Sequence, residues 1–198
     1  MKKLALALSL AAFSAAGQSA VFMSAEWAQQ ACEAWNTEEQ LTTGLAGKWI
    51  DNNADRGYKV IQIYRTECPD SPRVELTISA EDGIAKCTYG GAVAHAELNA
   101  DVDYLMYATD EDWVCMGEGK WGCGPMGAMA TGKLKFEGPK MEAMSVMGPF
   151  EGFLLLTGEG GLLLGEALRA LALEGAVVPC VETKPPLLDV DDVSGDGV

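Results

Sequence analysis

The sequence predicts one domain that combines helices and strands, and three observations predict it. Residues 24–37 have the apolar spacing of an amphipathic helix, with Ser24 as a plausible N-cap. Residues 58–65, 73–79 and 84–89 favour strands and are separated by turn-forming segments, which is typical of an antiparallel meander. The chain has 198 residues, of which 48% are hydrophobic, and this is enough for a folded core.

Alternation along the predicted meander indicates how its strands face. Val74, Leu76 and Ile78 alternate with polar residues, so we expect one buried face and one solvated face. Trp49 and Ile50 are expected to begin a strand of their own, before the turn cluster that precedes residue 58.

The second half of the domain is expected to alternate between strands and helices. Residues 102–108 predict a strand, and Thr109 with the acids after it predicts a helix that stops by Gly117. Residues 132–138 predict another strand. A short helix is expected to begin at Pro139, and Gly148 and Pro149 to end it after Met147.

The N-terminus has the pattern of a cleaved secretory signal. Lys2 and Lys3 precede an apolar stretch that is too short and too rich in small residues for a membrane span. We therefore predict a signal peptide at residues 1–20, cleaved near 16–20, and a periplasmic or secreted protein.

Beyond the domain, which we place at residues 21–157, two further segments are predicted. Residues 158–183 read as a Leu-rich helical extension. Residues 184–198 contain prolines and aspartates and are predicted to form an acidic disordered tail.

Charge and histidine content exclude several classes of function. The chain has 14 Lys and Arg against 29 Asp and Glu, a net charge of −15. This charge argues against nucleic-acid binding and against attachment to anionic lipid by charge alone. His95 is the single histidine, so a site with two His ligands is impossible. No nucleophile motif accompanies His95, and we interpret it as a surface or capping residue.

Acidic residues gather at Asp101 and Asp103 and again at 110–112. Carboxylate clusters can bind Ca²⁺, but a solvated face is the simpler interpretation. We expect no metal, no cofactor and no enzymatic activity.

Cysteine content supports export. An even number of cysteines in an exported chain indicates disulfides, and no pair has the C-x-x-C spacing of a redox or zinc site. Cys115 and Cys123 flank a glycine-rich loop and are the first pair to test, while the other pairings stay open. The candidates are Cys32, Cys68, Cys87, Cys115, Cys123 and Cys180.

Methionines concentrate in the second half of the chain. Met141, Met144 and Met147 recur every three residues, which places them on one side of a helix. Methionine is flexible and suits surfaces that adapt to apolar ligands, although such a stripe is more often part of a core.

The stretch MGAMATGKLKFEGPKMEAMSVM, residues 126–147, resembles the sterol carrier protein family, which has the type-two sterol-transfer domain. Residues 109–120 match the family's acid-capped helix, 132–138 its Gly-Lys-Leu-Lys strand and 141–147 its last apolar helix. The resemblance covers residues 24–157. The secretion signal at the N-terminus departs from the pattern of eukaryotic members and suggests an exported, bacterial-type member.

The resemblance implies an α+β fold, in which a mostly antiparallel five-stranded sheet packs helices on one face and encloses an apolar tunnel. It further implies a non-enzymatic carrier of a fatty acid, a sterol or a similar lipid. The acidity of the chain leaves any transient membrane contact to apolar rim residues. The cysteines and the segment beyond residue 157 depart from the family pattern. The residues predicted to line the tunnel are Trp113, Met116, Met129, Leu134, Phe136, Met141, Met144 and Met147.

Two other functions remain open from the sequence. As an accessory subunit, the domain would present a lipid-like substrate to an enzyme, with acids of the 110–112 cluster near the pocket. As an interaction module of the cell envelope, it would bind a partner through the extension and the acidic tail.

Overall fold

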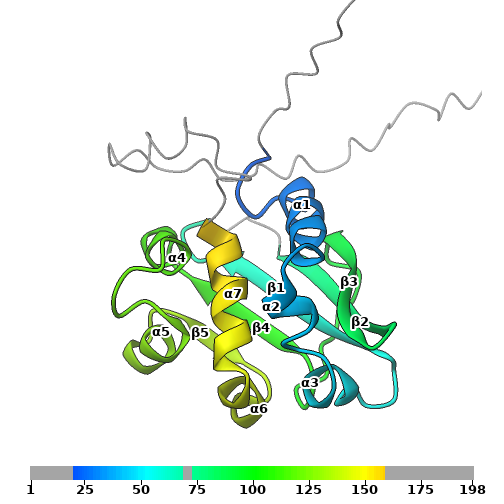
Figure 1. The fold of residues 1–198 in the computed structure, drawn as a ribbon. Coiled ribbons are helices and arrows are strands. Elements are labelled where there is room, and N and C mark those ends of the chain that lie inside the picture. The colour runs from blue at the N-terminus through cyan, green and yellow to red at the C-terminus, as the bar shows by residue number, and fades with distance from the viewer. Residues whose placement is uncertain (1–19, 69–72, 159–198) are drawn as a thin grey trace, which may run out of the picture.

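The computed structural model describes residues 20–68 and 73–158, which form an α+β domain (Figure 1). This confirms the predicted fold class. The predicted signal peptide up to residue 19, the acidic tail and the Leu-rich extension after residue 158 lie outside the described residues.

One five-stranded sheet contains the predicted meander and two further strands. Its order is β3-β2-β1-β4-β5, and all neighbours are antiparallel except β1 and β4, which are parallel. The sheet is therefore mostly antiparallel, as predicted. Its strands are β1 (Tyr58–Arg65), β2 (Val74–Glu81), β3 (Ile84–Ala92), β4 (Tyr104–Ala108) and β5 (Lys135–Glu137).

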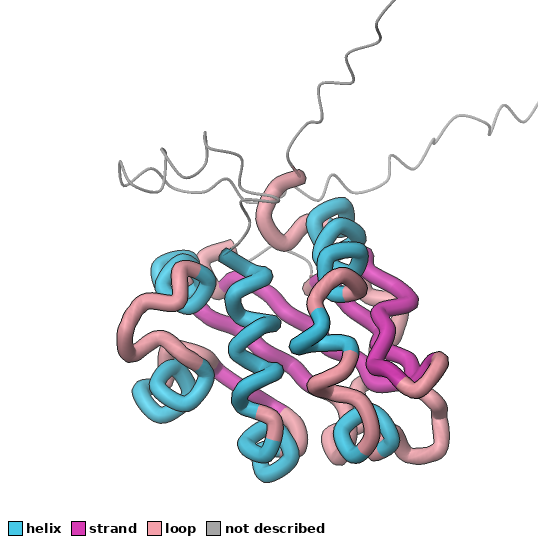
Figure 2. The backbone as a smooth tube through the Cα atoms, viewed as in Figure 1, coloured by secondary structure: helices cyan, strands magenta, loops and turns pink. Residues whose placement is uncertain are grey.

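The helices cover one face of this sheet (Figures 1 and 2). α7 crosses the middle of the helix layer and contacts α1, α2, α4, α5 and α6. The hydrophobic core lies between this layer and the sheet. The helices are α1 (Ala25–Trp35), α2 (Glu39–Thr42), α3 (Lys48–Asp51), α4 (Asp110–Gly117), α5 (Pro125–Thr131), α6 (Lys140–Ser145) and α7 (Met147–Gly158).

α1 is anchored closely to the sheet edge. The Ser24 hydroxyl accepts a hydrogen bond from the Trp27 amide at 3.1 Å, which confirms the predicted N-cap. A disulfide joins Cys32 to Cys87 of β3. Gly90 permits this close approach, because a Cβ atom there would lie 2.1 Å from the carbonyl oxygen of Ala28.

The helix-facing side of β1 carries a cation at each end. Ile61 and Ile63 belong to the core, and Lys59 and Arg65 share their side of the strand because side chains alternate with a period of two. Both cationic side chains are fully buried. The central strand therefore places two charges inside an otherwise apolar layer.

The opposite face of the sheet is not fully solvated, which corrects the expectation of one solvated face. Residues 93–103 connect β3 to β4, and their backbone bonds to side chains on this face. The Glu75 carboxylate accepts from the amides of Ala94 and His95 at 3.2 and 3.0 Å, and the Gln62 amide donates to the His95 carbonyl at 2.7 Å. Glu75 and Gln62 are consequently only 0% and 1% exposed.

The expected strand at Trp49 and Ile50 is wrong, since both residues lie in α3. Both are buried, at 4% and 2% exposure. Consecutive residues of a strand point to opposite faces, whereas one helical turn lets neighbours approach the same core.

The end of the helix that was expected to run from Pro139 to Met147 is also different. α6 ends at Ser145, and Gly148 and Pro149 lie in the first turn of α7 rather than stopping a helix. A proline is tolerated there because the first amides of a helix have no intrahelical acceptor.

Candidate functional site

Most of the residues predicted to line a tunnel lie on the helix-covered side of the sheet. They come from α4, α5, β5 and the residue before it, and the start of α7. Trp113, Met116, Leu134 and Phe136 are buried in the core, Met129 packs against it and Met147 is half-buried. Met141 and Met144 differ, since they are 80% and 49% exposed.

α6 presents these two methionines outward because other side chains occupy its inner side. Ala143 is fully buried, and the Glu142 carboxylate reaches Lys59 of β1. Met141 and Met144 share a face, as their spacing predicts, but it is the exposed face. The structure therefore does not bring them together with the buried methionines.

Six aromatic rings form a closed circuit of contacts in the helix-sheet layer. Successive ring centroids lie 5.3–6.5 Å apart, a range in which aromatic pairs attract one another. Of the six, only Phe136 was among the predicted lining residues. In order, this aromatic circuit contains Trp35 of α1, Trp49 of α3, Tyr104 of β4, Phe136 of β5, and Phe150 and Phe153 of α7, which returns to Trp35.

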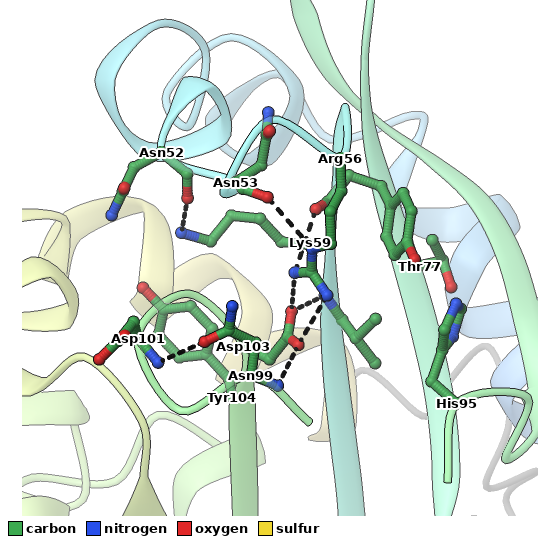
Figure 3. A network of polar contacts seen from close by, with 12 residues as sticks. Asn52, Asn53, Arg56, Lys59, Thr77, His95, Asn99, Asp101, Asp103 and Tyr104 are labelled. Carbon is green, nitrogen blue, oxygen red and sulfur yellow. Dashed lines mark hydrogen bonds and ion pairs between the residues drawn. The ribbon is translucent and has the colours of Figure 1, made fainter. Parts of the chain in front are cut away.

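A buried ammonium group lies beside this circuit. The Lys59 Nζ atom is 4.9 Å from the ring centroid of Trp49 and 5.3 Å from that of Tyr104. It donates to the Asn52 carbonyl at 2.9 Å, as Figure 3 shows, and to Glu142 Oε2 at 2.7 Å. These five residues, from α3, β1, β4 and α6 and the residue after α3, are the Lys59 cluster.

The donors of the Lys59 cluster converge on one carboxylate. Besides Lys59, the Tyr104 hydroxyl donates to Glu142 Oε2, and the Asn52 side-chain amide donates to Glu142 Oε1 at 2.7 Å. The Trp49 indole donates in turn to the Tyr104 oxygen at 2.8 Å, which orients the hydroxyl. The arrangement binds an anion from two sides with one charged and two neutral donors.

Burial shifts the proton affinities in this cluster. It lowers the pKa of Lys59 from its ordinary value, an effect that the neighbouring Glu142 carboxylate opposes. Burial, followed by the hydrogen bond and negative charge of Glu142, raises the pKa of Tyr104. Tyr104 is therefore a neutral donor at physiological pH.

Asp103 is part of a second ion pair rather than of a solvated acidic face. Its side chain is fully buried, and its two oxygens accept from Arg56 at 2.6 and 3.1 Å (Figure 3). The amides of Val60 and Asn99 donate to it as well, each at 2.8 Å. The hydrogen bond to Asp103 raises the pKa of Arg56. This pair fixes the start of β1 to the start of β4.

The acids at the start of α4 also have structural partners. Thr109 is the N-cap, as predicted, and its hydroxyl accepts from the Asp112 amide at 3.1 Å. Asp110 receives two bonds of 2.6 Å from Arg65, and Asp112 pairs with Lys133 at 2.7 Å. Among the described residues, no group of three or more His, Cys, Asp or Glu side chains is arranged to hold a metal ion.

A disulfide joins Cys115 to Cys123, the pair that the sequence placed first for testing. It ties α4 to the loop before α5. Cys68 is buried after β1, and Cys180 lies outside the described residues.

His95 lies on the face of the sheet away from the helices. Its Nδ1 atom is 2.6 Å from Glu75 Oε1, its side chain is one third exposed, and its ring contacts Tyr58 at 5.2 Å. A pocket of about 240 Å³ opens on the same face. It is lined by Arg73, Ala96, Leu98, Ala100, Asp103, Leu105, Glu137 and Gly138.

The burial of Lys59 could have been predicted from the alternation of residues along the strand. Lys59 has the same parity as Ile61 and Ile63, so a strand there places the lysine on the core face. Its acid partner could not be found this way, because Glu142 lies 83 residues further along the chain.

The fold and this layer define a class of protein, an α+β domain with an apolar interior covered by helices on one side. The model of the SCP-2 sterol transfer family matches residues 28–151, more than half of the chain. The chain thus belongs to the SCP-2 sterol transfer family, as the sequence resemblance indicated. Membership implies binding or transfer of lipids or sterols.

Solved structures similar to the chain include the crystal structure of a sterol carrier protein 2, with 18% identity and a TM-score of 0.47 over 69% of this chain and 97% of that one. A conserved hypothetical protein from Thermus thermophilus, described as a sterol carrier protein candidate, has 20% identity and a TM-score of 0.45 over 72% and 92%. The sterol carrier protein domain 2 of Helicoverpa armigera has 22% identity and a TM-score of 0.36 over 69% and 96%. No curated protein gives a significant match.

Within residues 20–68 and 73–158, every helix is too short or too polar to cross a bilayer.

Proposed function

We propose that the protein is an exported, non-enzymatic lipid carrier that holds a fatty acid, a sterol or a similar molecule between the sheet and the helices. The observation that carries this proposal is the aromatic circuit, which provides continuous apolar surface from α1 to β5. Trp113, Met116 and Leu134 belong to the same core, and Met129 packs against it. Membership of the SCP-2 sterol transfer family supports the same class of ligand.

Apolar burial supplies the driving force. Each buried methylene of an acyl chain contributes about 0.8 kcal/mol, and methylenes are chemically alike. Selectivity between neighbouring chain lengths is therefore loose, since about 0.8 kcal/mol for one methylene changes affinity only about fourfold. Met116, Met129 and Met147 are unbranched and can change rotamer, which lets the layer make room for a ligand.

Met141 and Met144 have a separate role in this proposal. Their exposed face on α6 supplies the apolar surface for transient contact with a membrane and forms the outer rim of the ligand's path. Because the chain carries a net charge of −15, its overall charge does not attract it to anionic lipid, and the contact depends on apolar residues.

Export is supported by the N-terminal pattern and by the disulfides Cys32–Cys87 and Cys115–Cys123, which persist in oxidising compartments. Sequencing the N-terminus of the mature protein tests it. A start within residues 17–21 is expected, and a mature protein that retains Lys2 and Lys3 would contradict export by this signal.

Ligand binding is tested by solvent extraction of the purified protein with mass spectrometry, and by displacement of a fluorescent fatty acid. We expect a co-purified lipid and saturable displacement. If no lipid is recovered and none can be loaded after delipidation, the protein is not a lipid carrier.

Two variants of α5 make this test specific. Met129 faces the layer, whereas Met126 of the same helix is 59% exposed. A Met129→Lys substitution places a charge in the layer and should lower the affinity for the fatty acid at least about tenfold, since an unpaired charge is costly in an apolar site. Met126→Lys should leave this affinity unchanged. If thermal melting shows that Met129→Lys does not fold, Met129→Gln replaces it. Equal binding by the Met129 and Met126 variants would contradict a ligand in this layer.

A further inference from the structure

We propose that the Lys59 cluster is the binding site for a ligand's carboxylate, and that Glu142 occupies it in the ligand-free protein. This inference rests on the proposed lipid-carrier function and names the ligand class, a free fatty acid. In the ligand-bound protein the fatty acid carboxylate takes the place of the Glu142 carboxylate, and α6 moves away from the sheet.

The first argument is the chemistry of the cluster. Lys59 and Tyr104 donate to one oxygen of the Glu142 carboxylate and Asn52 donates to the other, so the three donors fit the shape of any carboxylate. The donors come from β1, β4 and the residue after α3. They do not depend on α6, which contributes only the acceptor.

The second argument is the position of the cluster against the aromatic circuit. Trp49 and Tyr104 belong to both, and the Tyr104 ring contacts Phe136 at 5.3 Å. A carboxylate held at Lys59 therefore has continuous apolar surface beside it for the attached chain. A charged end next to an apolar surface is the pattern that a fatty acid requires.

The third argument is the cost of leaving Lys59 without an anion. Its side chain is fully buried between two aromatic rings, and an uncompensated ammonium in such a place is strongly unfavourable. If α6 moves, the vacated place must be filled by another anion. A fatty acid meets this requirement with one carboxylate exchanged for another, whereas the hydroxyl of a sterol or fatty alcohol leaves the charge of Lys59 unbalanced.

The fourth argument is that α6 is weakly attached. It has six residues, lacks a side-chain N-cap, and buries fully only Ala143. Met141 on its outer face is 80% exposed and loses little packing when α6 moves, and Met144 is 49% exposed. The bonds of Glu142 are thus a main attachment of α6, and the ligand competes directly with them.

The test compares a saturated fatty acid with the fatty alcohol of the same chain length, both as competitors of a fluorescent fatty acid. The wild type should bind the acid at least about tenfold more tightly than the alcohol, because only the acid can replace the Glu142 carboxylate without leaving the buried charge of Lys59 unbalanced. Lys59→Met should remove this preference and leave the alcohol's affinity unchanged. Lys133→Met is the matched control, because it removes a lysine paired with Asp112 on the surface.

Glu142→Gln tests the competition itself. Removal of the competing charge should raise the affinity for the acid about tenfold and leave the alcohol unaffected. Glu151→Gln, which removes an exposed acid from α7, should change neither. Hydrogen exchange provides a second readout, since the acid but not the alcohol should increase exchange in residues 140–145.

The outcomes separate this inference from the proposed function. If neither competitor displaces the probe, and no lipid can be loaded, the carrier function itself fails. If acid and alcohol bind equally to the wild type, or if Glu142→Gln leaves the acid's affinity unchanged, the carrier function stands and the carboxylate site is overturned. If Lys59→Met does not fold, Tyr104→Phe replaces it. This substitution removes one neutral donor and should lower the affinity for the acid but not for the alcohol.

Discussion

The two ends of β1 have the same chemistry but very different surroundings. At each end a fully buried cation faces the helix layer and pairs with a carboxylate from a helix: Lys59 with Glu142 of α6, and Arg65 with Asp110 of α4. Both pairs join the sheet to its helix cover across a long stretch of sequence. The difference lies in how firmly each helix is held by everything else.

α4 is held in several ways. Thr109 caps it, Asp112 pairs with Lys133, and the disulfide from Cys115 ties its last turn to the following loop. Arg65 also makes two bonds to Asp110, each of 2.6 Å.

Among the described residues, α6 has no side-chain cap, second ion pair or disulfide. Glu142 holds it through one lysine bond of 2.7 Å and the hydrogen bonds from Tyr104 and Asn52. The comparison teaches that two similar buried ion pairs can differ in how much else holds the helix, and this difference is the reason that the proposed carboxylate exchange falls at α6 and not at α4.

The largest expected effect comes from removing each cation in turn. Arg65→Met should lower the free energy of unfolding by about 3–5 kcal/mol, because it leaves a largely buried carboxylate without its partner. Lys59→Met should cost less, since Tyr104 and Asn52 still donate to the Glu142 carboxylate and burial already disfavours the charged lysine. Urea unfolding of the two variants measures the difference. A larger loss for Lys59→Met would reverse the comparison.

The next effect concerns the disulfide at the α4 end. Replacing Cys115 and Cys123 by serine should cost about 2–3 kcal/mol, as the chain-entropy relation gives for a short closed loop. Hydrogen exchange should then rise in residues 110–117 and stay unchanged in α6. The control is the Cys32 and Cys87 double serine variant, which should loosen α1 instead. Equal hydrogen exchange in α4 with and without the Cys115–Cys123 disulfide would show that this disulfide does not stabilise the helix.

A smaller effect is expected at the N-cap of α4. Thr109→Ala removes the side-chain acceptor of the Asp112 amide and should cost about 1 kcal/mol. Thr109→Ser keeps a hydroxyl at the same place and should stay close to the wild type. Thermal unfolding of the two variants compares them, and an equal loss for both would mean that the hydroxyl does not cap the helix.

The smallest effect is a dependence on pH at the α6 end. Burial lowers the pKa of folded Lys59 below that of the unfolded chain, so between these two pKa values the unfolded state binds more protons. Stability of the wild type relative to Lys59→Met should therefore rise as the pH increases toward about 10.4, the ordinary lysine value. At pH values below the folded-state pKa the difference should be constant. Urea unfolding across this range measures it, and a fall with rising pH would contradict a lysine destabilised by burial.

Much of the fold was predictable because it depends on local patterns. Alternation located the meander, and Ser24 and Thr109 marked two helix starts through their own hydroxyls. α5 was missed although Pro125 at its start and Gly132, with a φ of 77° at its end, are ordinary boundary signals. Apolar spacing is weak in a segment of small residues and methionines, and this concealed the helix.

The candidate site was predicted only in part, since periodicity shows that residues share a face of a helix but not whether that face points to the core or to solvent. Met141 and Met144 do lie on one side of a helix, but Glu142 and Ala143 take the inner side. Similarly, Glu75 alternates as a solvent-facing residue should, and is buried because residues 93–103 cover it.

The sequence by itself determined the acidic composition with its cysteines, the strands of the meander, the capped helices and the family resemblance. Composition is a property of the sequence itself, and the other three depend on residues that are close together in the chain. Only the tertiary structure decided which rings contact one another in the aromatic circuit and which carboxylate pairs with Lys59. These contacts join residues that lie far apart in the chain, such as Trp35 and Phe153. Such pairings depend on how the whole chain packs, and no local pattern specifies them.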